Sequence, residues 1–283
     1  MQFATRAKGA LNHLLRLANI RVETLTADRT EAERLQALER RGHFGKAVFP
    51  LLPQFAACNP MPILQQVKRD EPKFTELINN ENGFSLKNDY YTTPDAEVLY
   101  AFVQLYRPTK IVEVGSGYST QLFRRAIEDA KLDTELISID PRPRREIQDY
   151  SDRIIGEPVE DLSDRSFFEQ LRENDILFID SSHEIKAGND VVWLLLSVLP
   201  TLRPGVILHL HDIFLPYEYP RRWLIEEGWN WTEQYLVQAL LAAGESFTVL
   251  WPGHYLQKHQ PDFKNWFAQW RNADAKSLWL RKN

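Results

Sequence analysis

Residues 111–120 read IVEVGSGYST and decide the fold class. Their first half is a short run of branched apolar side chains interrupted by Glu113, which suits a buried strand. Gly115 and Gly117 follow, and glycine allows both a tight turn and a close backbone approach by a ligand. A strand, a glycine turn and a helix in this order predict the first unit of a parallel α/β sheet. In such sheets ligands bind at the carboxyl ends of the strands.

Similar strand patterns recur along the chain, separated by stretches that suit helices. After the strand at 111–114 we expect strands at 135–139, 153–155, 175–179, 206–210, 247–251 and 277–280. The expected helices cover 120–130, 144–150, 164–172, 184–202 and 232–243. Because strands alternate with helices, the sequence predicts right-handed βαβ units with helices on both faces of one sheet. The predicted fold is therefore a Rossmann-like, doubly wound α/β domain.

Two regions are expected, a helical extension or cap at 1–88 and the α/β domain at 89–283. The prolines and asparagines of residues 50–83 suggest short helices joined by turns. A further helix is expected from Thr93, because Pro94 suits the first helical position.

The extension contains two helix patterns. Residues 1–22 are basic, free of acidic side chains and amphipathic, which favours a helix packed on the body and leaves open a peripheral membrane contact. Thr30 and Glu33 match a capping box, and Gly42 suits the residue just after a helix. A second helix is therefore expected between Thr30 and Gly42.

Composition limits the classes of function. The 283 residues carry 34 basic and 39 acidic side chains, a net charge of −5, which argues against a protein that coats nucleic acid. Cys58 is the single cysteine, so the chain forms no internal disulfide and no cysteine zinc site. We expect a cytoplasmic location. The sequence contains no run of 18 or more apolar residues, so we expect no transmembrane segment. Nothing in the sequence determines the oligomeric state.

The glycine turn distinguishes between two classes of cofactor. A dinucleotide fingerprint needs a third glycine where Thr120 stands, so NAD is disfavoured. The E-x-G-x-G pattern of residues 113–117 instead resembles the first motif of class I S-adenosylmethionine-dependent methyltransferases. The cofactor that this resemblance implies has a carboxylate, which suits the backbone N–H groups of Ser116, Tyr118 and Ser119, and an ammonium, which favours an acid such as Glu113.

Other residues at strand ends complete the expected cofactor site. Asp140 ends the second strand, where an acid can accept hydrogen bonds from both ribose hydroxyls. By the same resemblance, Pro158 and Val159 border the adenine, and Glu160 or Asp161 meets its amino group. The resemblance also assigns Asp180 and Ser181, after the fourth strand, to the cofactor site.

Acids and histidines follow the fourth and fifth strands, in FIDSSH at 178–183 and HLHDIF at 209–214. If these ends converge, Asp180, His183, His211 and Asp212 form a cluster where the methyl group is presented. Imidazole titrates near neutrality, so His183 or His211 could accept a proton while a carboxylate such as Asp212 orients the ring. The alternative is that the histidines only shape their loops.

The spacing is also similar to that of catechol-type and sugar methyltransferases. The resemblance implies a magnesium ion held by an acid after the fourth strand and by an acid or amide pair after the fifth. Asp180 and Asp212 match, but His211 stands where an oxygen ligand is expected, and magnesium prefers oxygen. A histidine-tolerant metal, or none, therefore stays open.

The resemblance covers about residues 90–283 and implies a seven-stranded sheet with an antiparallel strand near its C-terminal end. It also implies methyl transfer to an oxygen of a small polar acceptor, such as a sugar or a natural-product intermediate. The sequence does not name the acceptor or decide between oxygen and nitrogen. Two alternatives stay open: a metal-dependent hydroxylase-like enzyme on the same fold, and a non-catalytic binding protein with a vestigial nucleotide pocket.

Overall fold

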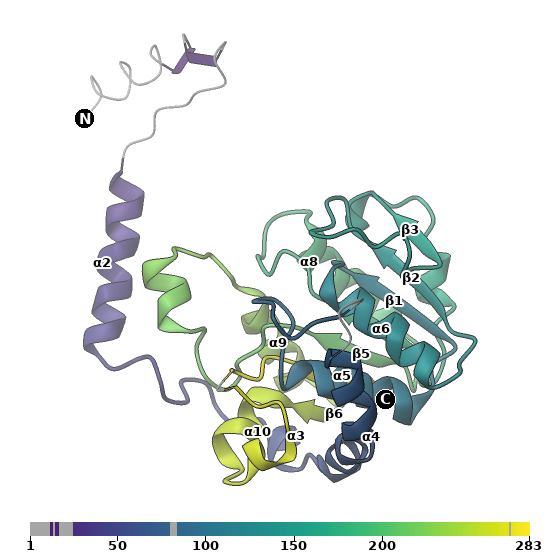
Figure 1. The fold of residues 1–283 in the computed structure, drawn as a ribbon. Coiled ribbons are helices and arrows are strands. Elements are labelled where there is room, and N and C mark those ends of the chain that lie inside the picture. The colour runs from purple at the N-terminus through teal and green to yellow at the C-terminus, as the bar shows by residue number, and fades with distance from the viewer. Residues whose placement is uncertain (1–11, 14, 17–24, 80–83, 272) are drawn as a thin grey trace. The chain divides into compact units, whose positions relative to one another are not determined.

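The computed structural model describes residues 12–13, 15–16, 25–79, 84–271 and 273–283 (Figure 1). The chain divides into two compact units, one of Met1–Gly45 with Pro220–Trp229 and one of Lys46–Tyr219 with Asn230–Asn283. The helix predicted over residues 1–22 lies almost entirely outside the described residues. None of the helices within the described ranges is long and apolar enough to cross a membrane.

The smaller unit contains helix α2 (Thr26–Arg40) and the π-helical turn η5 (Arg222–Glu226). α2 begins before Thr30, so the capping box predicted there is wrong, and no side chain caps the helix. Gly42 has a positive φ of 63° just after the helix, as predicted, and its N–H donates to the Glu39 carbonyl at 2.8 Å. Arg221 pairs with both Glu39 and Glu226 within this unit.

The larger unit is built on a seven-stranded sheet. The strands are β1 (Lys110–Val114), β2 (Glu135–Ile139), β3 (Arg153–Ile155), β4 (Ile176–Ile179), β5 (Ile207–Leu210), β6 (Phe247–Pro252) and β7 (Leu278–Lys282). They lie in the order β3-β2-β1-β4-β5-β7-β6. The first five are parallel, and β7 runs antiparallel to both β5 and β6. The predicted Rossmann-like sheet with an antiparallel strand near the C-terminus is thus confirmed.

Helices and turns cover both faces of this sheet (Figure 1). They are α3 (Pro53–Ala56), α4 (Met61–Asn79), α5 (Asp95–Tyr106), α6 (Tyr118–Asp129), η2 (Val159–Asp161), α7 (Ser166–Glu169), α8 (Asp190–Trp193), η3 (Leu194–Val198), η4 (Leu199–Thr201), α9 (Glu233–Ala242), α10 (Gly253–His259) and η6 (Phe263–Trp266). α4, α5 and α6 pack on one face; α7, the α8–η4 stretch and α9 pack on the other. α4 packs on α5 within the same unit, and the domain boundary expected at residue 88 stays a prediction.

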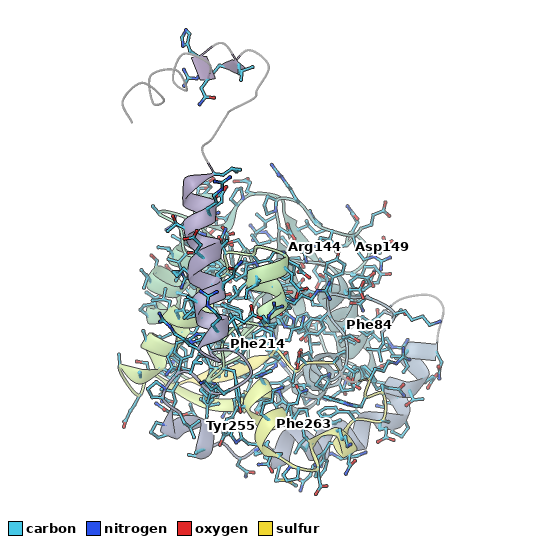
Figure 2. The ribbon with its side chains drawn as sticks, turned by 90° about the vertical axis from the view of Figure 1, so that its left-hand side faces the viewer. Phe84, Arg144, Asp149, Phe214, Tyr255 and Phe263 are labelled. Carbon is cyan, nitrogen blue, oxygen red and sulfur yellow. The ribbon has the colours of Figure 1, made fainter. Side chains whose placement is uncertain are left out.

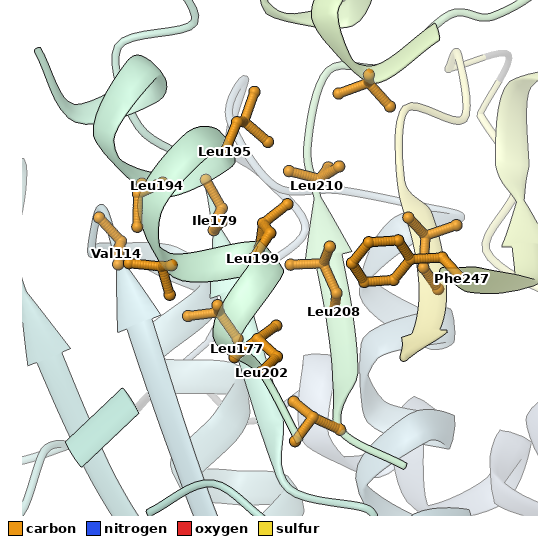
Figure 3. Close-up of a cluster of buried hydrophobic side chains, with 14 of the residues drawn as sticks. Val114, Leu177, Ile179, Leu194, Leu195, Leu199, Leu202, Leu208, Leu210 and Phe247 are labelled. Carbon is orange, nitrogen blue, oxygen red and sulfur yellow. The ribbon is translucent and has the colours of Figure 1, made fainter. Parts of the chain in front are cut away.

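Side-chain alternation along the strands separates the two cores. Figure 3 shows Leu177, Ile179, Leu208 and Leu210 facing Leu199 and its neighbours on the α8–η4 stretch. The residues between them point to the other face, because successive strand residues alternate. His209 is one of these. Its ring stacks on Phe178 at 3.9 Å and is 0% exposed, and burial holds its pKa well below the usual range. His209 is therefore a neutral core residue.

Three predicted helices differ from the structure. Residues 144–150 form turns, since Ile147 is the one buried side chain there and the segment has no apolar stripe to pack. The helix expected at 164–172 is shortened to α7. The helix expected at 184–202 begins only at Asp190, after Gly188 with a φ of 73°. It continues as the π-helical segment η3 before Pro200, which lacks a backbone N–H.

One helix is longer than expected. The segment at 50–83 contains helices, as predicted, but α4 continues through Pro72 instead of ending before it. Its buried stripe, which includes Val67 before the proline and Phe74 and Leu77 after it, keeps helical spacing across this position. Packing of that stripe offsets the free-energy cost of the backbone hydrogen bond that is lost because proline has no N–H.

Candidate active site

The turn between β1 and α6 needs glycine at position 115. Gly115 has a φ of +83°, and a Cβ atom there would lie 1.9 Å from the Asp180 carbonyl oxygen. The ends of β1 and β4 meet at this point, since the Asp180 N–H donates to the Val114 carbonyl at 2.9 Å. A Cβ on Gly117 would meet no protein atom within 4 Å. Gly115 therefore permits close packing, and Gly117 leaves open space.

Glu113 lies beneath this turn and is 0% exposed. Its carboxylate accepts hydrogen bonds from the hydroxyls of Ser119 at 2.7 Å, Thr120 at 2.6 Å and Ser138 at 2.9 Å. The Thr120 hydroxyl in turn accepts from the Gly117 N–H at 2.9 Å. Glu113 does not line the adjoining cavity, so the structure corrects its expected role as a direct partner of the ammonium. It ties the turn to β2 instead.

Replacing Glu113 by Gln is expected to remove a pH-dependent loss of stability. Burial raises the pKa of Glu113 to about 7, against hydrogen bonds from Thr120, Ser119 and Ser138 that lower it. The pKa of Glu113 is higher in the folded than in the unfolded protein, so protonated Glu113 stabilises the fold. This stabilisation is complete below the unfolded-state pKa near 4.5 and is lost as the pH rises through 7. The loss is no more than about 3 kcal/mol. Urea unfolding of wild type and Glu113→Gln at pH 5 and pH 8 measures this loss. If the free energy of unfolding changed equally with pH in the two proteins, the raised pKa of Glu113 would be contradicted.

A cavity of about 380 Å³ opens at the carboxyl ends of β1, β2, β3 and β4. This volume lies within the usual range for small-molecule sites. Ten of the eleven residues expected to bind the cofactor line it: Gly115, Ser116, Gly117, Tyr118, Ser119, Asp140, Pro158, Val159, Asp180 and Ser181. Glu160 lines it as well. The cavity lies where the strand order reverses, which is the ligand position in open α/β sheets.

Asp140 connects β2 to the glycine turn. Its Oδ2 atom accepts from the Ser116 N–H at 2.8 Å and from the Ser116 hydroxyl at 3.1 Å, while Oδ1 accepts from the Arg142 N–H at 2.7 Å. A carboxylate offers about four acceptor directions. Both ribose hydroxyls could therefore bind here only if the Ser116 hydroxyl rotates away. The ribose role of Asp140 stays a prediction.

The structure adds cavity residues that sequence reasoning missed, chiefly Tyr90, Tyr91 and Arg144. The Tyr90 ring stacks on Tyr118 with centroids 6.1 Å apart, and the Arg144 guanidinium lies 4.9 Å from the Tyr90 centroid. Figure 2 labels Arg144 together with Asp149, which comes from the same loop but does not line the cavity. No sequence signal places the segment around residue 90 beside the glycine turn.

A buried group of ionisable side chains adjoins the cavity. His183 Nε2 lies 3.2 Å from Asp180 Oδ1 and 3.7 Å from Asp212 Oδ2, and Nδ1 lies 2.9 Å from Glu233 Oε2. Burial alone would lower the pKa of His183, but its hydrogen bonds to Asp180 and Glu233 and the Asp212 charge raise it well above the usual range. In the absence of a competing cation, His183 is therefore an imidazolium and a poor base.

His211 also lies in this group, behind the cavity wall. Its ring packs on Tyr91 with centroids 4.9 Å apart, and Nε2 lies 3.9 Å from Asp212 Oδ1. Neither ring nitrogen has a hydrogen-bond partner among the described residues. The predicted cluster of Asp180, His183, His211 and Asp212 is thus brought together, but Asp180 alone of the four lines the cavity.

Lys276 is a further member of the group that the sequence did not indicate. Its Nζ lies 3.2 Å from Asp212 Oδ1. Its backbone is held on both sides, since its N–H donates to Asp95 Oδ2 at 3.0 Å and its carbonyl accepts from the Ile213 N–H at 2.9 Å. Lys276 lies in an irregular segment before β7, where no sequence pattern indicates a functional residue.

The model of a family described as a methyltransferase domain matches residues 112–213. Residues 112–213 of this chain are therefore similar to a methyltransferase domain. The matched part runs from β1 to the end of β5 and so contains Glu113, Asp140, Asp180 and Asp212. The predicted resemblance to class I S-adenosylmethionine-dependent methyltransferases is confirmed for this part of the chain.

Individual proteins also resemble parts of this chain. An uncharacterized protein of Archaeoglobus fulgidus is 39% identical over 95 residues, which are 31% of this chain and 42% of that protein. The solved structure of the methyltransferase PaMTH1 of Podospora anserina bound to SAH is 14% identical, covers 84% of this chain and 99% of that one, and has a TM-score of 0.42. The plantazolicin methyltransferase BpumL with SAH is 13% identical, covers 90% and 99%, and has a TM-score of 0.39.

Proposed function

We propose that the protein transfers the methyl group of S-adenosylmethionine to an oxygen of a small polar acceptor, such as a sugar or a natural-product intermediate. One observation carries this proposal: residues from four separate strand ends, predicted as cofactor ligands, line one open cavity. A vestigial pocket filled by side chains would not leave this volume. The cytoplasm stays the expected location.

The residues of the cavity suit a cofactor that carries two positive centres and one carboxylate. Asp180, Glu160 and Asp190 line the cavity together with Asp140, and acids favour a sulfonium and an ammonium. The carboxylate would meet the N–H groups at the start of α6, where the helix dipole favours an anion. Pro158 and Val159 would border the adenine. The bound cofactor supplies the electrophilic methyl group, so the protein mainly aligns the acceptor with it.

His211 is the better placed of the two candidate bases. His183 is held by three carboxylates, whereas the His211 ring nitrogens have no hydrogen-bond partner among the described residues. Tyr91 packs on His211 and lines the cavity. A small shift of the Tyr91 ring would therefore connect His211 with the cavity. His211 would then take the proton of the acceptor hydroxyl, with Asp212 orienting its imidazole.

Replacing His211 by Ala should slow methyl transfer without changing the affinity for S-adenosylhomocysteine. The purified protein would be incubated with isotopically labelled S-adenosylmethionine and fractionated small-molecule extracts. Mass spectrometry would find the labelled product, and NMR would locate the new methyl group on oxygen. His259→Ala is the matched control, because His259 is an exposed histidine away from the cavity. A methyl group on nitrogen or carbon, or equal rates in wild type and His211→Ala, would reject this part of the proposal.

A further inference from the structure

We propose that Asp180, His183 and Asp212 bind one divalent transition-metal ion, that Glu233 and Lys276 position these ligands, and that His183 disfavours magnesium. The ion would lie at the acceptor end of the proposed active site. Its role in turnover rests on the proposed function, but its binding does not.

The three ligand atoms already lie close to the geometry that an ion requires. One atom from each side chain can be chosen so that all lie within 4.8 Å of one another. His183 Nε2 is 3.2 Å from Asp180 Oδ1 and 3.7 Å from Asp212 Oδ2. Adjacent ligands of an ion with bonds of about 2.0 to 2.2 Å are roughly 3 to 3.5 Å apart. Only small side-chain movements would therefore be needed to hold an ion.

The backbone fixes where these ligands point. Asp180 directly follows β4, and Asp212 is the second residue after the neighbouring strand β5. Both His183 and Asp212 have positive φ values, 61° and 55°. The carbonyl of His183 accepts from the N–H groups of Thr232 at 2.8 Å and Glu233 at 3.1 Å. Non-glycine residues rarely adopt such a conformation, and it persists where the surroundings impose it. Two such residues in one small group indicate a site built for a purpose beyond packing.

Glu233 determines which nitrogen of His183 is available. Its Oε2 atom lies 2.9 Å from Nδ1, so Nδ1 carries a proton toward Glu233 and Nε2 faces the two aspartates. Histidine ligands of metals commonly donate their second N–H to a carboxylate in this way. An ion would replace the proton on Nε2. The start of α9 therefore supplies the residue that orients the ligand.

Lys276 fixes the second carboxylate and leaves one of its oxygens free. The ammonium contacts Asp212 Oδ1 at 3.2 Å, whereas Oδ2 faces His183. With His183 neutral, the three carboxylates that contact it exceed the single ammonium by two charges. A divalent cation would balance this excess within a buried environment, where unpaired charges are costly.

The donor set argues for a transition metal. Magnesium demands oxygen ligands, whereas one imidazole and two carboxylates suit ions such as zinc, cobalt or manganese. The resemblance to catechol-type enzymes implies an acid or amide pair after β5, and only Asp212 fits that pattern in this chain. His183, which follows β4 instead, completes the set.

The test uses the full-length protein after treatment with a chelator and calorimetric titration with Co²⁺ or Mg²⁺ alone. We expect one equivalent of Co²⁺ to bind and Mg²⁺ to bind far more weakly. Glu233→Gln keeps the shape but not the charge and should weaken Co²⁺ binding about 10- to 100-fold, with a changed visible spectrum of the bound ion. His183→Asp should shift the preference toward Mg²⁺. His259→Ala, the matched histidine control, should bind Co²⁺ like wild type.

Each outcome decides between the two proposals. If wild type binds no equivalent of Co²⁺, Zn²⁺ or Mn²⁺ but still binds S-adenosylhomocysteine, the group is a salt-bridge network and the metal proposal is wrong. The same conclusion follows if Glu233→Gln and His183→Asp bind Co²⁺ like wild type, since the ion then lies elsewhere. Metal binding without any binding of S-adenosylhomocysteine would instead reject the proposed methyl transfer. Circular dichroism of each variant would show that it is folded.

Discussion

Replacing Asp140 by Ala is expected to weaken binding of S-adenosylhomocysteine by about 100- to 1000-fold. Hydrogen bonds to a charged group contribute about 1.5 to 3 kcal/mol each, and we assign the ribose hydroxyls to this carboxylate. The same change also removes the acceptor of the Ser116 N–H. Both effects act on the cofactor cavity and neither acts on the sheet core. The measurement is a calorimetric titration of wild type and variant with S-adenosylhomocysteine.

Two further variants separate these effects. Asp140→Asn keeps an oxygen that can accept from Ser116 but loses the charge, so its affinity should fall between wild type and Asp140→Ala. Asp149→Ala removes an exposed acid from the same loop that does not line the cavity, and this variant should bind like wild type. If Asp140→Ala bound S-adenosylhomocysteine within about threefold of wild type, the ribose assignment would be rejected.

The Gly115→Ala change is expected to lower the free energy of unfolding by about 2 to 5 kcal/mol. A methyl group there would overlap the Asp180 carbonyl oxygen, 1.9 Å away, and overpacking costs about 1 to 3 kcal/mol. The left-handed conformation of this residue adds about 1 to 2 kcal/mol for any residue with a Cβ. Because the atoms nearest to the added methyl group belong to the backbone of Asp180 and Ser181, they can move little. Urea unfolding measures the loss.

Gly117→Ala is the matched comparison, because a Cβ there meets no protein atom within 4 Å. Its stability should stay within about 1 kcal/mol of wild type, whereas its affinity for S-adenosylhomocysteine should fall as the methyl group enters the cavity. A stable Gly115→Ala protein, or Gly117→Ala with undiminished affinity, would show that the turn is not shaped as described.

The sheet and most of the cavity could be predicted because local patterns determine them. The branched apolar residues of 111–114 and 176–179 form strands wherever they are buried, and parallel strands bring their carboxyl ends to one edge. This rule places Asp140 and Asp180 at the same edge of the sheet, and the resemblance assigns Asp180 to the cofactor site. The orientation of Glu113 could have been found as well. Strand alternation places it on the face opposite to Val114, toward the Ser138 hydroxyl and away from the cavity.

Other features depend on contacts that the local sequence does not encode. Tyr90 and Lys276 lie far from β1 in the sequence, and only the folded chain brings them to the cavity and to Asp212. The failed helix at residues 144–150 has acceptable helix formers, but it lacks the apolar stripe that would anchor it to the sheet. Glu233 appeared as an ordinary first-turn acid of α9, and its contact with His183 is tertiary.

A crystal structure of the protein soaked with S-adenosylhomocysteine is the most direct test of where the cofactor binds. We expect density for the ligand in the cavity beside Gly117, with its ribose hydroxyls on the Asp140 carboxylate and its carboxylate at the start of α6. Ligand density at another site, or an empty cavity at saturating ligand concentration, would contradict this expectation.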